Sequence, residues 1–319
     1  MKKHSVWLLP LLMIVMPLLP CSVALAQELS GIPGAYVDVG LGVRPLGMGG
    51  AYVAVAQDES AARWNPAALA NQQRRSAGFT WTKQMNLIPY NYLSGTFPMY
   101  RKGVGYYIEA SGDDALRENT IAVAYGSKVS QLPHLGNSTR LSVGVVAKLR
   151  WASFGDNPNG GEGQVTGDAV GYGFDVGLLY NLPLVNGLTA GVMLRDAFNT
   201  ISWNSSTSGQ YSEAVPTTLA CGFAYQKGRR VLVTFDIMPA LYSDVYTRFA
   251  LGGEYRLLKV IALRGGVAQD IGSTRPNRDV TAGLGVEVPI MGTATLDAGA
   301  SYLFDELVNT PRVGLAIRW

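Results

Sequence analysis

Hydrophobic and polar residues alternate along most of the chain from Ala77 onward. The last segment shows the pattern in full, with one face formed by Val313, Leu315, Ile317 and Trp319 and the other by Arg312, Gly314, Ala316 and Arg318. A period of two residues is that of a β-strand, whose successive side chains point to opposite faces. An apolar face that ends in an aromatic residue suits lipid and its interface, although a strand of a soluble sandwich can alternate in the same way.

The same alternation recurs in about fourteen segments. An even number of antiparallel strands is what closed bacterial membrane barrels contain, so the pattern predicts an all-β fold, a transmembrane antiparallel β-barrel. The predicted strands are residues 77–82, 90–97, 103–111, 120–128, 140–151, 168–181, 188–195, 217–226, 230–237, 247–255, 261–268, 280–288, 294–302 and 312–319.

The connections and the aromatic residues follow a second regularity. If the first strand leaves the periplasm, the long polar connections 152–167, 196–216 and 269–279 lie outside, and tight connections such as 227–229 and 257–259 lie inside. Long outer loops and short inner turns are typical of outer-membrane barrels. Two aromatic girdles are also predicted, the inner one from Phe97, Tyr125, Tyr180, Tyr225, Tyr255 and Trp319 and the outer one from Trp81, Trp151, Phe235 and Tyr302.

The first 26 residues have the pattern of a secretory signal peptide. Lys2 and Lys3 precede an apolar stretch over residues 6–19, and residues 24–26 read Ala-Leu-Ala. We therefore expect the signal peptide to cover 1–26 and the mature chain to begin at Gln27. No later apolar run approaches the roughly 18 residues that a membrane-spanning helix needs, which leaves a periplasmic or secreted protein, or a barrel in the outer membrane of a Gram-negative-type bacterium.

Composition supports the barrel and argues against several other functions. Charged residues make up 15% of the chain, whereas about 25% of the residues of a typical domain are charged. Glycine accounts for 38 of the 319 residues, more than the usual share of about 7%. A formal charge of +3 gives no sign of nucleic-acid binding. Once the signal peptide is removed, Cys221 and His134 are the only cysteine and histidine. We therefore predict no catalytic residue, no metal site, no cofactor and no enzyme activity.

A segment of different character precedes the first strand. It is rich in glycine over residues 31–50, and then predicts a short helix over about 59–64 with Asp58 as its N-cap. Asn65 and Pro66 stop that helix and cap a further turn through Leu69. The segment is either a periplasmic extension or a plug folded into the barrel mouth. We expect a hatch within residues 27–75 and a transmembrane barrel over 76–319, with the hatch residues Arg44, Gly47, Met48, Gly49, Gly50, Asp58, Trp64, Asn65 and Pro66.

Residues 41–58, LGVRPLGMGGAYVAVAQD, followed by Trp64-Asn65-Pro66-Ala67, closely resemble the N-terminal signature of PorV/PorQ-type outer-membrane proteins. That group is similar to the FadL-like family of long-chain fatty acid transporters. The resemblance implies a fourteen-stranded barrel with an N-terminal hatch; some relatives move hydrophobic compounds, and others are outer-membrane partners of type IX secretion. The last strand, ending in Trp319, likewise resembles the assembly signal that the barrel-assembly machinery recognises.

Charged residues on the inward faces of the strands are candidates for the lumen. Buried charges need partners, so we expect most of them to pair with one another and a minority to line a solute path. The predicted lumen charges are Arg140, Lys148, Arg150, Asp175, Arg195, Arg230, Asp236, Arg248, Glu254, Arg264, Glu287 and Asp297.

Two functions remain open for such a barrel in outer-membrane lipid. The first, which we favour, is passive transport of hydrophobic or amphipathic small molecules, and it predicts a continuous cavity with an apolar pocket beside the hatch. The second is an anchor or partner role in a type IX-like secretion system, with secretion-system components as partners. It predicts a filled lumen and an exposed apolar patch on the outer loops, formed by Tyr211, Leu241 and Tyr242.

Overall fold

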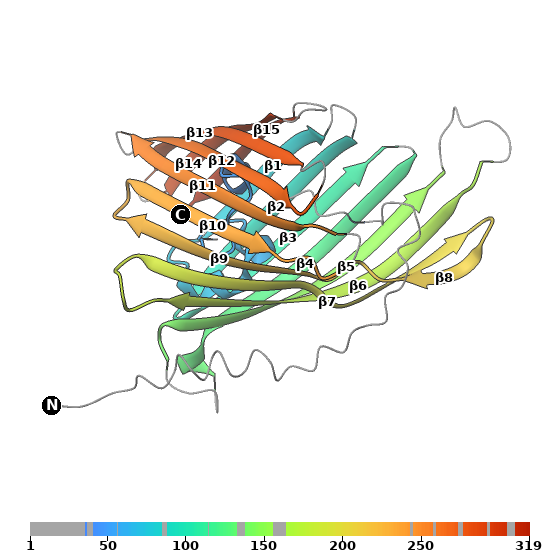
Figure 1. The fold of residues 1–319 in the computed structure, drawn as a ribbon, viewed down its shortest axis with the longest axis horizontal. Helices are drawn as coiled ribbons and strands as arrows, with labels where there is room; N and C mark the ends of the chain where they lie inside the picture. Colours follow the sequence, from blue (N-terminus) through green and yellow to red (C-terminus); the bar gives the residue numbers. More distant parts are fainter. Residues whose placement is uncertain are drawn as a thin grey trace. The chain divides into compact units, whose positions relative to one another are not determined.

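The strands form one closed antiparallel sheet (Figure 1). The computed structural model of the protein describes residue 36 and residues 41–55, 57–84, 88–113, 115–132, 138–155, 164–242, 245–257, 260–273, 277–291, 294–304 and 310–319. The predicted signal peptide, the start of the mature chain and His134 lie outside these residues. Among the described residues, none of the helices has the length and apolar character that crossing a membrane requires.

Each predicted strand corresponds to an observed one. The strands are β1 (Ser76–Gln84), β2 (Ile88–Met99), β3 (Lys102–Gly112), β4 (Leu116–Lys128), β5 (Leu141–Phe154), β6 (Gly167–Asn181), β7 (Leu188–Ser205), β8 (Gly209–Glu213), β9 (Thr218–Lys227), β10 (Val231–Met238), β11 (Thr247–Leu257), β12 (Ile261–Ile271), β13 (Arg278–Met291), β14 (Ala294–Phe304) and β15 (Thr310–Arg318). Consecutive strands of the ring pair side by side, and β1 pairs with β15, so the sheet closes on itself. Because β8 pairs only with β7, the ring contains the fourteen other strands, as predicted.

The ring has two ends, which we name by the strands. The terminal end is where β1 starts and β15 finishes, and the distal end is the opposite one. At the terminal end β6 and β7 are joined by residues 182–187 and β9 and β10 by residues 228–230. A longer connection at that end, residues 129–140, contains the short helix η2 (Val129–Gln131). Residues 155–166 and 239–246 connect strands at the distal end.

Side chains alternate between the two faces of the wall as the sequence predicts. In β6, Val170 and Tyr172 are 58% and 52% exposed, whereas Ala169 and Leu179 are buried. The outward face is therefore apolar, as lipid contact requires. The outward aromatics Phe97 and Trp319 are also exposed.

The predicted loop 196–216 is mostly strand. β7 continues to Ser205 and forms a hairpin with β8 at the distal end (Figure 1). Phe174 of β6 pairs with Phe198 and Val176 pairs with Leu194, so three residues of β7 lie opposite one residue of β6. Such a bulge interrupts the alternation. Beyond it the outward positions Thr200, Ser202 and Asn204 are polar, whereas Ile201 and Trp203 are buried on the inward face, the reverse of the lipid-facing pattern, which explains why the sequence predicts a loop here.

The buried core lies inside the ring rather than between two sheets. Residues 41–55 and 57–71, which we call the N-terminal segment, contain α2 (Val43–Gly47), α3 (Ala61–Trp64) and the 3-10 helix η1 (Pro66–Asn71). The main cluster of buried apolar side chains combines this segment with the inward face of the wall. Its largest members are Tyr52, Trp64 and Leu69 from the segment and Tyr92 and Tyr107 from β2 and β3.

Candidate functional site

The N-terminal segment crosses the interior of the ring. η1 contacts β2 to β6, whereas α2 contacts β12 to β15 on the other side. Figure 1 shows the segment in blue within the ring of strands. The segment and the wall around it therefore form the candidate site.

Many wall residues that contact the N-terminal segment are glycines, which have no side chain. A side chain at Gly144 would overlap Pro66, and one at Gly252 would overlap the backbone of Met48. Glycine permits this close approach of two backbones because it has no Cβ. The wall glycines whose added side chain would overlap the segment are Gly78, Gly103, Gly126, Gly144, Gly177, Gly191, Gly252, Gly266 and Gly314.

Asn65 lies between α3 and η1 and connects them to the wall. Its Oδ1 accepts a hydrogen bond from the Ala67 backbone N–H at 3.1 Å, so Asn65 caps η1 as predicted. Its Nδ2 donates to the carbonyl of Val53 at 2.8 Å and to that of Leu178 in β6 at 3.0 Å. One fully buried amide therefore fixes a helix start, a neighbouring turn and a strand.

Arg44 attaches the opposite side of the segment to the wall. Its guanidinium makes a bidentate pair with Glu254 of β11, at 2.7 Å and 3.0 Å. It also donates to the Tyr52 hydroxyl at 2.9 Å and to Asp58 at 3.2 Å, and the Tyr52 hydroxyl donates to Asp58 in turn. Because these groups are largely removed from water, their charges interact more strongly than on a surface.

Glu254 lies at the centre of a larger ionic cluster. Besides Arg44, it accepts from Arg264 at 2.9 Å and from Arg256 at 3.2 Å. Arg256 continues to Glu287 of β13 at 2.7 Å. The side of the segment that faces β11 to β13 is thus held by charge as well as by close packing, and on the opposite side Arg63 pairs with Glu109 of β3 at 2.7 Å.

Two neighbouring carboxyl groups of the segment differ in acidity. Burial would raise the pKa of Asp58, but Arg44 and Arg318 outweigh it and bring that pKa below its usual value. Burial, and next the charge of Asp58, raise the pKa of Glu59 to about 7. Glu59 is 3.9 Å from Arg318, too long for a hydrogen bond.

Val53 separates two cavities inside the ring. Its side chain is fully buried and packs with Met193 of β7 and Ala220 of β9. Along β7, Thr189 lines the cavity at the terminal end and Arg195 lines the cavity toward the distal end. These two residues are about 20 Å apart along the strand at the usual rise per residue. Val53, Met193 and Ala220, which we call the Val53 layer, lie between them.

Asp236 of β10 holds the Val53 layer in place. The residue is 1% exposed, and its Oδ2 accepts hydrogen bonds from the backbone N–H groups of Tyr52 at 2.6 Å and Val53 at 2.9 Å. The Val53 layer is therefore attached to the wall through the backbone of Tyr52 and Val53, and not only through side-chain packing.

The distal cavity has a volume of about 220 Å³ and a lining that mixes aromatic and charged groups. In the bulge of β7, Asp196 accepts from Lys148 at 2.6 Å and from Arg150 at 2.8 Å, and Lys148 also pairs with Asp175 at 2.6 Å. The aromatic lining of the distal cavity comes from Tyr36, Tyr90 and Tyr107.

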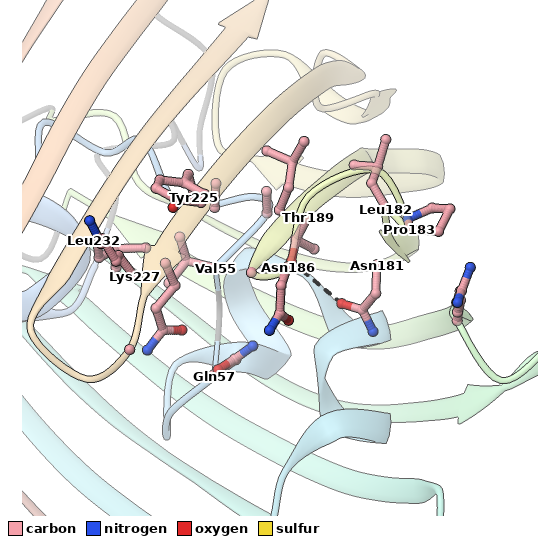
Figure 2. Close-up of a pocket in the computed structure, with 17 residues that line it drawn as sticks. Val55, Gln57, Asn181, Leu182, Pro183, Asn186, Thr189, Tyr225, Lys227 and Leu232 are labelled. Atoms are coloured by element: carbon pink, nitrogen blue, oxygen red, sulfur yellow. Dashed lines mark hydrogen bonds between the residues drawn. The ribbon is translucent and has the colours of Figure 1, made fainter.

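The terminal cavity is larger, about 810 Å³. Figure 2 shows it between the β6–β7 turn, the β9–β10 hairpin and residues of the N-terminal segment. Val55 and Leu232 are part of its apolar lining, and the amides of Gln57, Asn181 and Asn186 are part of its polar lining. Its volume is in the range of small-molecule sites, about 300–1,000 Å³.

Two of the predicted lumen charges lie at the end of the ring and not along its strands. Arg140 and Arg230 precede β5 and β10 and are exposed at the terminal end. Arg140 lines the terminal cavity, whereas Arg230 lies in the turn between β9 and β10, so the placement of Arg230 in the lumen is wrong. The other predicted lumen charges are buried or half-buried on the inward face, and they are Lys148, Arg150, Asp175, Arg195, Asp236, Arg248, Glu254, Arg264, Glu287 and Asp297.

Most of these inward charges take part in ion pairs. Besides the pairs above, Arg248 bonds to Asp270 at 2.7 Å and to Asp279, and Asp297 bonds to Arg318 at 3.0 Å. Asp236 accepts from backbone amides, and the guanidinium of Arg195 also lies over the Trp64 ring at 5.4 Å.

The predicted hatch residues all belong to the buried segment, with one change of role. The N-cap of α3 is Ser60, and Asp58 is not a cap; its Oδ1 instead accepts from the Ser60 backbone N–H at 3.1 Å. The helix starts two residues later than predicted because that turn precedes it.

The other hatch residues are packed within the barrel. The Trp64 indole donates to the Leu41 carbonyl at 2.8 Å. Gly47 lies against Arg264, Met48 is fully buried, and Gly49 and Gly50 have positive φ angles.

Several residues of the site were not predicted. Arg256 and Arg318 continue the inward alternation of β11 and β15, and that signal could have identified them. Asp196 could not be found by alternation, because it lies in the bulge with φ at 52°. No pattern in the sequence distinguishes Val53 from the other small apolar residues near it.

The described residues contain no group of three or more histidine, cysteine, aspartate or glutamate residues that could hold a metal ion. Cys221, in β9, is half-buried and forms no disulfide.

Comparison with solved structures finds the same barrel in bacterial channels. The CymD monoaromatic hydrocarbon channel has 17% identity and a TM-score of 0.61, covering 89% of this chain and 98% of its own. The Ralstonia pickettii toluene transporter TbuX has 15% identity and a TM-score of 0.58, covering 88% and 97%. A Pseudomonas aeruginosa FadL homologue has 14% identity and a TM-score of 0.58, covering 87% and 96%.

At these identities the likeness establishes the fold, a closed fourteen-stranded antiparallel β-barrel like that of FadL-type channels. No protein-family model matches the sequence, and no curated protein matches it.

Proposed function

We propose that the protein is an outer-membrane channel for the passive transport of hydrophobic or amphipathic small molecules. The N-terminal segment is the hatch, and residues 76–319 are the membrane barrel around it. The observation that carries this proposal is the Val53 layer, which separates two cavities in the interior of one closed ring. A solute can pass between the cavities when this layer moves.

The comparisons support the same class of solute. TbuX and TodX are toluene transporters and CymD is a monoaromatic hydrocarbon channel. The tyrosines of the distal cavity are suitable neighbours for an aromatic molecule. Because these fold relatives are channels, we propose that this protein is not an enzyme.

The outward face fits a position in the outer membrane of a Gram-negative-type bacterium. Apolar side chains face out along the strands, and Trp319 and Tyr255 are exposed near the terminal end. Lipid would surround this face, and the barrel-assembly machinery would recognise the last strand.

A second candidate is the partner role in type IX-like secretion that the PorV/PorQ resemblance implies. The observation that favours it is the packing of the N-terminal segment, whose buried side chains fill the ring between the two cavities. Leu241 is also exposed at the distal end, but Tyr211 stacks on Trp203 and the Tyr242 hydroxyl accepts from the backbone of Thr217. The predicted apolar patch is therefore only partly available, and we favour transport.

Uptake of radiolabelled toluene by Gram-negative cells that lack their own hydrocarbon channels tests the proposal. Cells expressing the native chain should take up toluene faster than vector controls, and Val53→Gly should be faster still because it removes the side chain of the barrier. Thr120→Trp, which places a bulky ring in the distal cavity, should be slower at equal abundance and with unchanged heat-modifiable migration. Uptake at the vector level in both the native chain and Val53→Gly would refute transport and leave the partner role.

A further inference from the structure

Four of the exposed arginines lie at three places on the rim of the terminal end. Arg75 precedes β1, Arg101 lies between β2 and β3, and Arg229 and Arg230 lie between β9 and β10. None of them forms an ion pair within the described part of the chain. We call these four residues the basic rim.

The carboxylates nearest this end already have partners. Glu287 of β13 is held by Arg256 at 2.7 Å, and Asp297 of β14 is held by Arg318 at 3.0 Å. Both carboxylates belong to the interior of the barrel and do not neutralise the basic rim. The terminal end therefore presents positive charge outward.

Two arginines of the rim lie beside outward-facing aromatic rings. Arg75 exchanges two backbone hydrogen bonds with Trp319, both at 3.0 Å, and Trp319 is 41% exposed. The guanidinium of Arg101 lies 5.0 Å from the centre of the Tyr100 ring, which is 75% exposed. Exposed tryptophan and tyrosine at a membrane protein's girdle mark the level of the lipid headgroups. These arginines are therefore at headgroup level.

Arg229 and Arg230 lie in the turn between β9 and β10. The carbonyl of Arg230 accepts from the backbone N–H of Arg256 at 2.8 Å, so Arg230 lies opposite Arg256, and its neighbour Val231 pairs with Tyr255. Tyr255 is 47% exposed on the outward face, so the turn lies at the level of an outward aromatic residue. Exposed arginines thus occur at separate places around the barrel, and not in one patch.

The distal end lacks this arrangement. Its exposed charges have both signs, with Asp113 and Asp168 as well as Lys83 and Arg117. A surface of mixed charge has no general attraction for anions, whereas the basic rim does. Anionic groups would therefore be attracted to the terminal end of the barrel and not to its distal end.

We propose that the basic rim binds the phosphate groups of anionic phospholipids in the membrane leaflet around the terminal end. A guanidinium is suited to this because it donates two parallel hydrogen bonds to phosphate oxygens, and a negative lipid surface attracts basic residues next to it. The proposal rests on the membrane position given under Proposed function, and it adds a lipid class that the transport proposal does not require.

Arg140 and Lys227 supply a matched control. They carry the same charge at the same end and are also exposed, but they line the terminal cavity. General electrostatic attraction would involve them as much as the rim, whereas binding at headgroup level would not.

The test reconstitutes the folded barrel in phosphatidylcholine bilayers and measures quenching of tryptophan fluorescence by dibrominated lipids. Trp319 lies beside the rim and reports on the adjacent lipid. Dibrominated phosphatidylglycerol should bind about threefold or more better than dibrominated phosphatidylcholine at low ionic strength. Replacing all four rim arginines with glutamine should reduce this ratio to about one, whereas Arg140→Gln with Lys227→Gln should leave it unchanged.

Three results would overturn the proposal: a ratio near one for the native barrel, an equal loss in the control pair, or loss of the preference when millimolar inorganic phosphate is added at constant ionic strength. The last result would assign the rim to soluble anions. Heat-modifiable migration verifies that each variant is folded. Because toluene uptake is a separate readout, a barrel that prefers phosphatidylglycerol without taking up toluene would refute transport alone, and the reverse result would refute only the lipid site.

Discussion

Replacing Asn65 with alanine is expected to loosen the hatch without unfolding the barrel. The substitution removes a cap, which is usually worth about 0.5–2 kcal/mol, and two hydrogen bonds to carbonyl groups, each worth about 0.5–1.5 kcal/mol. Together these predict a loss of about 2–4 kcal/mol in the free energy that keeps the segment seated. Since 1.4 kcal/mol is a factor of ten, the unseated population should rise about 30- to 700-fold.

Asn71→Ala is the matched control. Asn71 ends the same 3-10 helix, and its amide nitrogen has no hydrogen-bond partner. The two variants thus make the same chemical change, but only one removes hydrogen bonds between the segment and the wall.

Single-channel recording in planar bilayers is the assay. Asn65→Ala should open more often than the native chain, whereas Asn71→Ala should match it, and both should keep heat-modifiable migration. Equal open probabilities for the two variants would refute the reasoning, because the contacts of Asn65 would then not hold the barrier.

Four further outcomes are expected. Glu254→Gln should leave three arginines without their shared carboxylate, weaken the seating of the segment by about 3–5 kcal/mol and raise the leak of small solutes from liposomes; an unchanged leak would contradict the ionic attachment. Because the pKa of Glu59 is raised to about 7, its contribution to seating is full below the usual glutamate pKa and is lost as pH rises through 7; leak should therefore increase from pH 5 to pH 8 in the native chain, and pH-independent leak would contradict this. With Cys221 replaced, a membrane-impermeant thiol reagent on intact cells should label a cysteine at Ser206 and not one at Arg229, and the reverse pattern would invert the assigned orientation. Trp319→Ala should lower the amount of barrel in the outer membrane more than the melting temperature of barrel already formed, and normal amounts in the membrane would count against an assembly role.

The wall could be predicted from the sequence because lipid imposes a simple rule. An outward side chain must be apolar and its inward neighbours need not be, so each strand shows a period of two even when its partners are unknown. The rule fails where lipid does not reach. Residues 197–205 extend β7 beyond the bulge with the polar residues Thr200, Ser202 and Asn204 on the outward face, so the sequence predicts a loop there.

The interior could be predicted only in part. Asn65 before Pro66 is a local signal, and its capping role follows from neighbouring positions in the sequence. The pairing of Arg44 with Glu254 joins residues 210 positions apart, and nothing local specifies that partner. Asp236 was recognised as an inward charge, but its acceptance of two backbone amides depends on a turn whose position only the folded barrel defines.

The wall glycines that contact the N-terminal segment have a consequence for the barrel itself. Positions such as Gly126 and Gly144 carry no side chain that could pack across the lumen, and glycine inside a strand weakens it. The N-terminal segment fills that space, so it acts as an internal brace for β3 to β6 as well as a stopper. A barrel emptied of the segment would lose stiffness along those strands, and its cross-section would become easier to deform. Opening of the channel and softening of its wall would then be a single event.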